Sequence, residues 1–162
     1  MSAATHTLAF SGKLLERGFW LYVWVIEAPA ETLHYVGRTG DSSSSNAQSP
    51  FNRMGQHLGF NVKSNAIRRH LEALGVDPAR CELRLVAHGP LLEEGKTVDE
   101  HRERRDVVAA LEKALADAMT RAGYRVINRV HCQKPLDPAL FETVRAAFAT
   151  DFEKLAQTKG IA

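Results

Sequence analysis

The strongest constraint on the fold is an apolar run over residues 20–26, Trp-Leu-Tyr-Val-Trp-Val-Ile, rich in aromatic and β-branched side chains. A strand has this composition when both of its faces are covered. Ala-Pro-Ala-Glu interrupts the run, and a second short apolar run follows over residues 32–37. The pair predicts an antiparallel hairpin with its turn over residues 27–30.

That turn sets the register of the hairpin. Ile26 is then opposite Glu31, and Tyr22 is opposite Tyr35. Opposed residues share one face of a sheet, so the two phenol groups are expected to point the same way. Gly37 follows them, and its missing side chain would let another backbone or a phosphate approach closely.

The rest of the pattern predicts an α+β fold, with a small, three-stranded, mostly antiparallel sheet flanked by helices. Alternating apolar residues over 80–87 predict the third strand. Helices are expected over residues 50–58, 65–74 and 98–121 and from residue 137 onward. We find no domain boundary, so residues 1–162 are expected to form a single domain, with a C-terminal helical extension over 136–158. Residues 6–10 are expected either as a short strand or lying loosely on the domain.

Composition argues against several classes of protein. No apolar run approaches the ~20 residues that span a bilayer, and no basic region precedes an apolar core at the N-terminus, so no membrane partner and no secretory signal are expected. The two cysteines, Cys81 and Cys132, lie far apart, which favours free thiols and a cytoplasmic location. No paired ligands accompany His131 and Cys132, which argues against zinc.

Positive charge is concentrated in one part of the chain, although the net charge is only +2. Residues 42–71 hold four Lys or Arg, two His and no acidic residue. Such a patch suits a polyanion, and the alternative is a solvated basic face. The serine-rich loop from Ser42 to Ser49 is interpreted either as a substrate contact or as a tolerated surface loop.

Chemically capable residues follow one another in an order that resembles the GIY-YIG nuclease domain family. The family pattern is a tyrosine, a Tyr-x-Gly triplet, a helical Arg with His four residues later, a Glu in a later helix, and an Asn after it. The match covers roughly residues 19–130. The first triplet, Trp-Leu-Tyr, keeps only the tyrosine, and the serine-rich loop is longer than is usual in the family. The matching residues are Tyr22, Tyr35, Gly37, Arg53, His57, Glu112 and Asn128.

The resemblance implies a divalent-metal-dependent endonuclease that hydrolyses phosphodiester bonds of nucleic acid, of DNA rather than RNA. Glu112 lies on a mainly apolar side of its predicted helix, and an unpaired buried carboxylate is costly, so it needs a cation or a metal ion. Carboxylate ligation suits one Mg²⁺ or Mn²⁺ ion. The alternative is a partly exposed Glu112 paired with Arg105 or Lys113.

The residues that this hypothesis expects to contact phosphate are either basic or glycine. Arg53 offers a planar fork of donors that stays charged at neutral pH. Arg38, Gly37 and Lys63 are the further expected phosphate-binding residues. For Arg53 the alternative is an ordinary surface arginine.

The expected proton transfer begins at Tyr22. A metal ion, Arg53 and Arg38 would lower the pKa of Tyr22, which could then take a proton from the attacking water, with His57 as a relay. Tyr35 would hydrogen-bond the phosphate or the water. The alternatives are core packing for both tyrosines and an exposed helix position for His57.

Two supporting residues and two rival functions complete the prediction. Asn128 would hold Glu112 or its own short segment, and Asp41 is assigned to turn chemistry. One rival is a nucleic-acid-binding module without catalysis, which would bind in a salt-sensitive way and cleave nothing. The other is a protein-interaction domain, such as a homodimer through the C-terminal helix and its stripe of Phe148 and Phe152.

Overall fold

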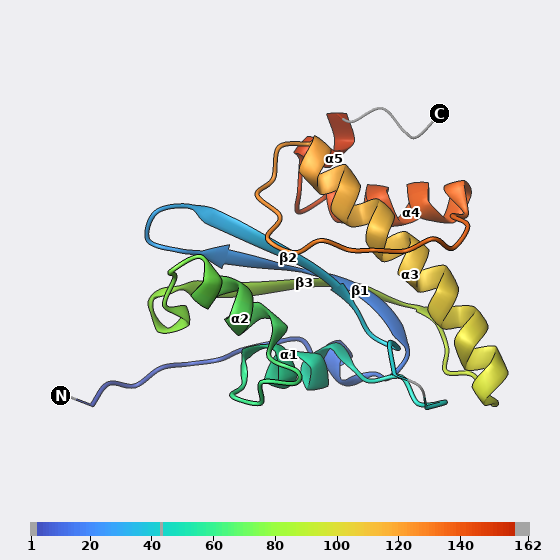
Figure 1. Ribbon diagram of the computed structural model, residues 1–162, viewed down its shortest axis with the longest axis horizontal. Coiled ribbons are helices and arrows are strands. Elements are labelled where there is room, and N and C mark those ends of the chain that lie inside the picture. Colours follow the sequence, from blue (N-terminus) through green and yellow to red (C-terminus); the bar gives the residue numbers. More distant parts are fainter. Residues whose placement is uncertain (1–2, 43, 158–162) are drawn as a thin grey trace.

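The computed structural model describes residues 3–42 and 44–157, and it has the expected α+β architecture. Its sheet is antiparallel and has three strands in the order β2-β1-β3 (Figure 1). The first strand is therefore central, which explains why its residues are apolar on both faces. The strands are β1 (Phe19–Glu27), β2 (Thr32–Arg38) and β3 (Glu82–Leu92).

Helices cover both faces of this sheet. The first two α-helices lie on one face, and the long third helix lies on the other face together with the C-terminal helices (Figure 1). Two short 3-10 helices, η1 (Gly12–Leu15) and η2 (Pro78–Arg80), precede β1 and β3. The α-helices are α1 (Pro50–Leu58), α2 (Ala66–Ala73), α3 (Val98–Arg121), α4 (Pro138–Ala149) and α5 (Lys154–Gln157).

The helix predictions are confirmed where the local signals are strong. Helix α1 begins at Pro50, and the Ser49 side chain caps it by accepting a hydrogen bond from Asn52 N. Helix α3 has the predicted bounds. The last helix is divided into α4 and α5, and the third strand is longer than predicted because it continues to Leu92.

The hairpin register differs from the prediction by two residues. The turn lies one residue later along the chain than expected, so Tyr22 is opposite Gly37 and Trp24 is opposite Tyr35. A shift of two residues preserves which face each side chain occupies, because side chains alternate with period two. The expectation that Tyr22 and Tyr35 share a face is therefore confirmed, although they are not directly opposed.

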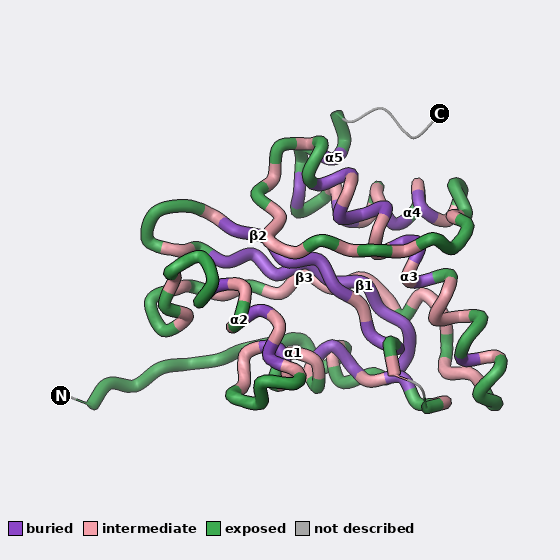
Figure 2. The backbone as a smooth tube through the Cα atoms, in the orientation of Figure 1, coloured by how far each residue is buried: buried purple, intermediate pink, exposed green. Residues whose placement is uncertain are grey.

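The sheet divides the interior into two apolar clusters, and strands β1 and β2 are buried along most of their length, whereas β3 is only partly buried (Figure 2). The smaller cluster packs Tyr22, Trp24 and Tyr35 against α1 and α2. The larger one packs the other face of β1 against α3, α4 and α5. Tyr22 and Tyr35 thus both lie in the smaller cluster. Helix α3, which carries Glu112, covers the opposite face of the sheet.

The C-terminal helices are part of the larger cluster. Phe148, Phe152 and Leu155 are each at most 2 % exposed. The apolar stripe that suggested a docking face for a homodimer is therefore buried within the chain. Residue 158, the last of the expected extension, lies outside the described residues.

Two segments without regular structure lie at the periphery. Residues 3–10 are exposed and irregular, and residues 8–10 lie beside α1 and β3. The serine-rich loop is anchored in three places: Ala47 N donates to Glu94, Arg17 donates to the Ala47 carbonyl, and the His101 ring lies 3.2 Å from the Ser42 carbonyl. Ser43 lies outside the described residues. Over residues 3–42 and 44–157, no helix combines the length and the apolar character needed to cross a bilayer.

Candidate active site

The candidate site lies at the end of strand β2, where its outer edge is uncovered. Up to Val36 that edge is covered by residues 124–128, which run parallel to it and bridge to His34. Asn128 completes the cover, because its Oδ1 accepts from Val36 N at 3.0 Å and its Nδ2 donates to Val36 O at 2.8 Å. Asn128 therefore holds its own segment against β2, one of the two predicted roles, and it does not hold Glu112.

Gly37 is the first residue beyond this cover, and the ring of Tyr22 lies directly on it. A Cβ added at Gly37 would be 2.5 Å from Tyr22 Cε2 and 2.7 Å from its hydroxyl. The glycine thus makes room for the phenol of its own neighbour on β1. The close approach at the Cβ position of Gly37 is therefore that of a tyrosine ring, and the phosphate contact expected at Gly37 stays a prediction.

Helix α1 brings a histidine to the same phenol. The Tyr22 hydroxyl and His57 Nε2 share a hydrogen bond of 2.6 Å. The ring of Tyr35 also faces His57, with centroids 5.2 Å apart. His57 is only 2 % exposed, so the interpretation as an exposed helix residue is wrong.

Burial sets the protonation of these three rings. Burial and the nearby Arg53 charge lower the pKa of His57 to about 4, so its imidazole is neutral at pH 7. Burial also raises the pKa of Tyr22 well above its ordinary value, and burial together with Glu112 raises the pKa of Tyr35 to about 12. Without a metal ion, desolvation outweighs the effect of Arg53 on the Tyr22 pKa, and the lowering expected with a bound metal ion stays a prediction.

Arg53 lies one helical turn before His57 and is held by two acceptors. Its Nη2 donates to Asp41 at 2.9 Å, and its Nη1 donates to Gln56 at 2.8 Å. Its guanidinium also interacts with the Tyr22 hydroxyl, although its buried Nε makes no well-aligned hydrogen bond among the described residues. The assignment of Asp41 to turn chemistry misses its contact with Arg53. The available signal was an acid in the loop that joins β2 to the arginine-bearing helix.

Glu112 reaches the site from α3 and pairs with Arg38 at the end of β2. Arg38 Nε donates to Glu112 Oε2 at 2.9 Å. Burial raises the pKa of Glu112 to about 7, against the opposing effect of Arg38. The alternative partners are wrong, because Arg105 pairs with Asp106 and Lys113 pairs with Asp117.

Glu112 and the phenols belong to opposite faces of the sheet, yet their charges interact around the β2 edge. The carboxylate of Glu112 raises the pKa of both Tyr22 and Tyr35, and Arg53 lowers the pKa of Glu112. The Arg38, Arg53 and Glu112 side chains are 16, 17 and 15 % exposed. The two guanidinium groups and the carboxylate are thus largely desolvated but still accessible. Glu112 influences the pKa of both phenols from the opposite face, and no hydrogen bond joins it to either phenol among the described residues.

The other basic residues of the stretch 42–71 differ in whether they contact the candidate site. Lys63 is exposed in the turn between α1 and α2, and no contact in the described part of the chain links it to the site. Arg68 instead donates to the carbonyl groups of Leu58 and Gly59 at the end of α1. The sequence pattern did not assign two further residues to the site. The ring centroid of His70 lies 5.9 Å from that of Tyr35, and the charge of Arg69 lowers the pKa of Tyr35.

The site fits a metal ion only if water and substrate supply most of its ligands. Over residues 3–42 and 44–157, no group of three or more His, Cys, Asp or Glu side chains could hold an ion. Glu112 offers Oε1, which accepts no hydrogen bond within the same described ranges. One accessible carboxylate oxygen suits Mg²⁺, which usually retains several waters and takes one or two carboxylates together with phosphate oxygens.

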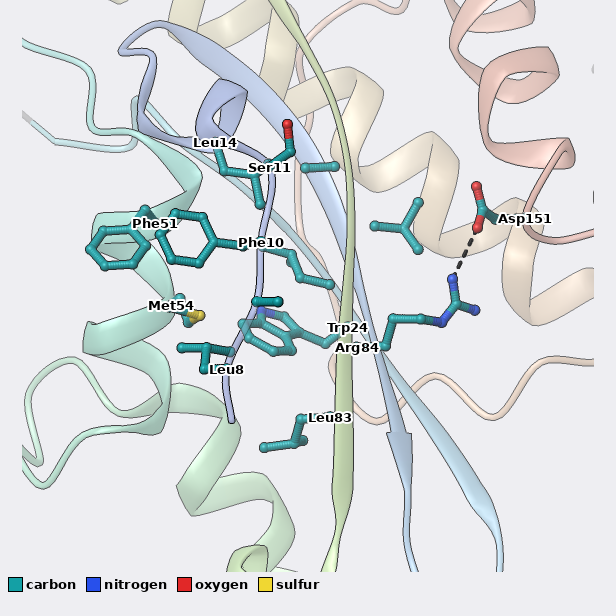
Figure 3. A pocket seen from close by; sticks show the side chains of 14 residues that line it. Leu8, Phe10, Ser11, Leu14, Trp24, Phe51, Met54, Leu83, Arg84 and Asp151 are labelled. Carbon is teal, nitrogen blue, oxygen red and sulfur yellow. Dashed lines mark hydrogen bonds and ion pairs between the residues drawn. The ribbon is translucent and has the colours of Figure 1, made fainter. Parts of the chain in front are cut away.

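Another cavity lies away from the end of β2 and has a different character. It measures about 440 Å³ and separates residues 8–14 from β3 and α1. Figure 3 shows mainly apolar side chains around it, among them Leu8, Phe10 and Trp24, with the Arg84–Asp151 ion pair at one margin. No tyrosine, histidine or glutamate lines it among the described residues, so we do not place the candidate active site there.

Comparison of the chain with models of protein families, with curated proteins and with solved structures found no match. Membership of the nuclease family therefore remains a hypothesis that depends on the residues and on their geometry.

Proposed function

We propose that the protein is a divalent-metal-dependent endonuclease of the GIY-YIG type that hydrolyses phosphodiester bonds. One observation carries the proposal. Two buried guanidinium N–H donors, Arg38 Nη1 and Arg53 Nε, have no partner among the described residues. Arg38 pairs with Glu112, and Arg53 pairs with Asp41 while its charge lowers the pKa of Glu112. Unpaired buried donors are costly, and a phosphate would supply acceptor oxygens for both.

The acid and the arginines would bind and polarise the phosphate. Arg53 and Arg38 would stabilise the negative charge that grows on its oxygens during attack. Glu112 would hold one Mg²⁺ or Mn²⁺ ion, which would act as a Lewis acid on the phosphate and its leaving oxygen. Asp41 is then the group that the phosphate must displace from Arg53, since both compete for the same guanidinium.

Proton transfer would use the Tyr22–His57 pair. The phenol is protonated at pH 7 and cannot itself act as a phenolate base, but it can receive a proton from water while passing its own proton to His57 Nε2. The neutral imidazole is the final acceptor and becomes imidazolium, which the Asp41 charge would stabilise. Tyr35 would orient the water or a phosphate oxygen from the other side of His57.

The test is nicking of supercoiled plasmid in the presence of Mg²⁺, Mn²⁺ or a chelator, with branched DNA and RNA as further substrates. Glu112→Gln and Arg53→Ala are each expected to reduce the rate at least about a hundredfold, as loss of one charge-stabilising group does in other enzymes. Glu103→Ala, an exposed acid on the same helix, is the matched control and should retain the wild-type rate. Full activity in a folded Glu112→Gln protein would reject the assignment.

DNA is proposed over RNA from the family resemblance alone, and the parallel RNA substrates test that choice. Salt-sensitive binding without cleavage under any divalent ion would instead identify a binding module of the same fold.

A further inference from the structure

A second, smaller cavity adjoins the candidate active site on the α3 side. It has a volume of about 380 Å³ and lies between α3 and the segment 131–134. Arg38 lines it and also binds Glu112, so the cavity and the active site share one wall. Its lining residues are Arg38, Arg105, Asp106, Ala109, His131, Cys132, Gln133 and Lys134.

The charges around this cavity are organised by one carboxylate. Asp106 accepts from Lys134 Nζ at 2.8 Å and from Arg105 Nη2 at 3.3 Å. Two cations around one acid leave an excess positive charge. Lys134 and Arg105 keep 53 and 31 % of their side-chain surface exposed, so both can also contact an anion in the cavity. Arg38 Nη1, which has no hydrogen-bond partner in the described part of the chain, adds a buried donor to the side chain that forms the shared wall.

The position of the cavity suits a nucleic-acid strand that passes through the active site. Arg105 and Asp106 precede Glu112 by seven and six residues on α3, which is about 10 Å along the helix axis. Each strand of a duplex carries a phosphate about every 3.4 Å of axis. A strand whose scissile phosphate lies at Glu112 therefore brings neighbouring phosphates within reach of this cavity.

We propose that the cavity is a subsite for a backbone phosphate that flanks the scissile one, with Arg105 and Lys134 as its contacts and Asp106 as the residue that positions them. The subsite rests on the proposed function, because it assumes that the active site binds nucleic acid. It binds the backbone without reading the sequence, since its charged groups recognise phosphate. It is formed partly by residues 131–134, which follow the part of the chain that resembles the nuclease family.

Binding measured as a function of salt tests the subsite without depending on cleavage. Fluorescence anisotropy with a labelled DNA duplex, in Ca²⁺ or chelator and over a range of KCl concentrations, gives the slope of log affinity against log salt. Arg105→Gln with Lys134→Gln should reduce that slope by about 1, because the slope counts neutralised phosphates and the subsite holds one. Arg80→Gln with Arg121→Gln is the control, because it makes the same charge change at exposed positions that do not line the cavity.

Asp106→Asn provides a test of opposite sign. The amide keeps an oxygen for Lys134 and Arg105 but removes the competing charge, so affinity should rise severalfold with no basic residue added. A merely structural role for Asp106 would give no such gain.

The outcomes separate this proposal from the proposed function. A reduced slope in the double variant together with tighter binding by Asp106→Asn supports the subsite, and supports it even if no divalent ion yields cleavage. If the wild type cleaves DNA but the double variant binds like its control, the subsite is wrong and the nuclease assignment stands. If the wild type binds no nucleic acid, both are wrong.

Discussion

Gly37 has no side chain, and the phenol of Tyr22 occupies the space that a side chain would take. Gly37→Ala would place a Cβ 2.5–2.7 Å from three atoms of Tyr22. We expect it to cost about 1–3 kcal/mol of stability, as overpacking does, and to displace the hydroxyl from His57. Urea unfolding and plasmid nicking measure the two effects.

Gly55→Ala is the matched control for that substitution. Gly55 lies inside α1, and an added Cβ meets nothing within 4 Å. Alanine should therefore stabilise the helix by about 0.5–1 kcal/mol. Equal effects of the two substitutions would contradict the account of the Tyr22–Gly37 contact.

His57 should make folding sensitive to acid. Its pKa is about 4 in the folded protein, below the ordinary 6.5, because burial and Arg53 disfavour its charged form. Its contribution is therefore fully present above pH 6.5 and is lost as the pH falls through 4. The difference corresponds to about 3 kcal/mol.

Urea unfolding between pH 7 and 4 tests this sign and compares His57→Gln with the wild type. The free energy of unfolding of the variant should fall less on acidification than that of the wild type. His131→Gln changes an exposed position, and its free energy of unfolding should fall on acidification as much as that of the wild type. A wild type that becomes more stable on acidification, relative to His57→Gln, would overturn the assignment of a neutral His57.

At the scale of elements, the edge of β2 is paired by backbone hydrogen bonds at His34 and by one side-chain amide at Val36. Asn128 substitutes for a neighbouring strand by pairing with both the N–H and the C=O of Val36. Asn128→Ala would leave both groups without their partner, and each unsatisfied group costs about 1–3 kcal/mol where it stays dry. We expect clear destabilisation and faster hydrogen exchange at the Val36 amide.

Asn52→Ala is the comparison for Asn128→Ala. Asn52 is exposed on α1, so its removal should change the free energy of unfolding by no more than about 0.5 kcal/mol. An unchanged exchange rate at Val36 in the Asn128 variant would show that the amide does not hold the edge.

For the molecule as a whole, the C-terminal helices complete the core. Phe141, Val144 and Phe148 are each at most 1 % exposed in the larger apolar cluster. Truncation after Leu136 would uncover that face of the sheet and α3, so the shortened protein should aggregate or lose its cooperative unfolding transition. Circular dichroism melts and light scattering test this.

Deletion of residues 1–9 is the contrasting truncation. The described part of that segment is exposed, so the protein should remain folded with a small change in melting temperature. A folded, cooperative protein that ends at Leu136 would show that the two apolar clusters are independent.

Local pattern determined the elements of this protein. The apolar run of β1, the Ser49–Pro50 start of α1 and the periodicity of α3 each depend on neighbouring residues only, and these predictions are confirmed. The same pattern assigned Tyr22 and Tyr35 to one face, because alternation along a strand survives a register shift of two. The hairpin register itself was wrong, since the composition of the turn did not specify which four residues form it.

Only the tertiary structure decided the partners and the proton affinities at the candidate site. Glu112 pairs with Arg38, 74 residues away, and Arg53 pairs with Asp41 from the loop before its helix. The phenol of Tyr22 resists ionisation because it is buried, which the charges near it in sequence could not indicate. Pairing and desolvation depend on how distant segments pack, so the sequence could name the reactive groups but could not assign their charge states.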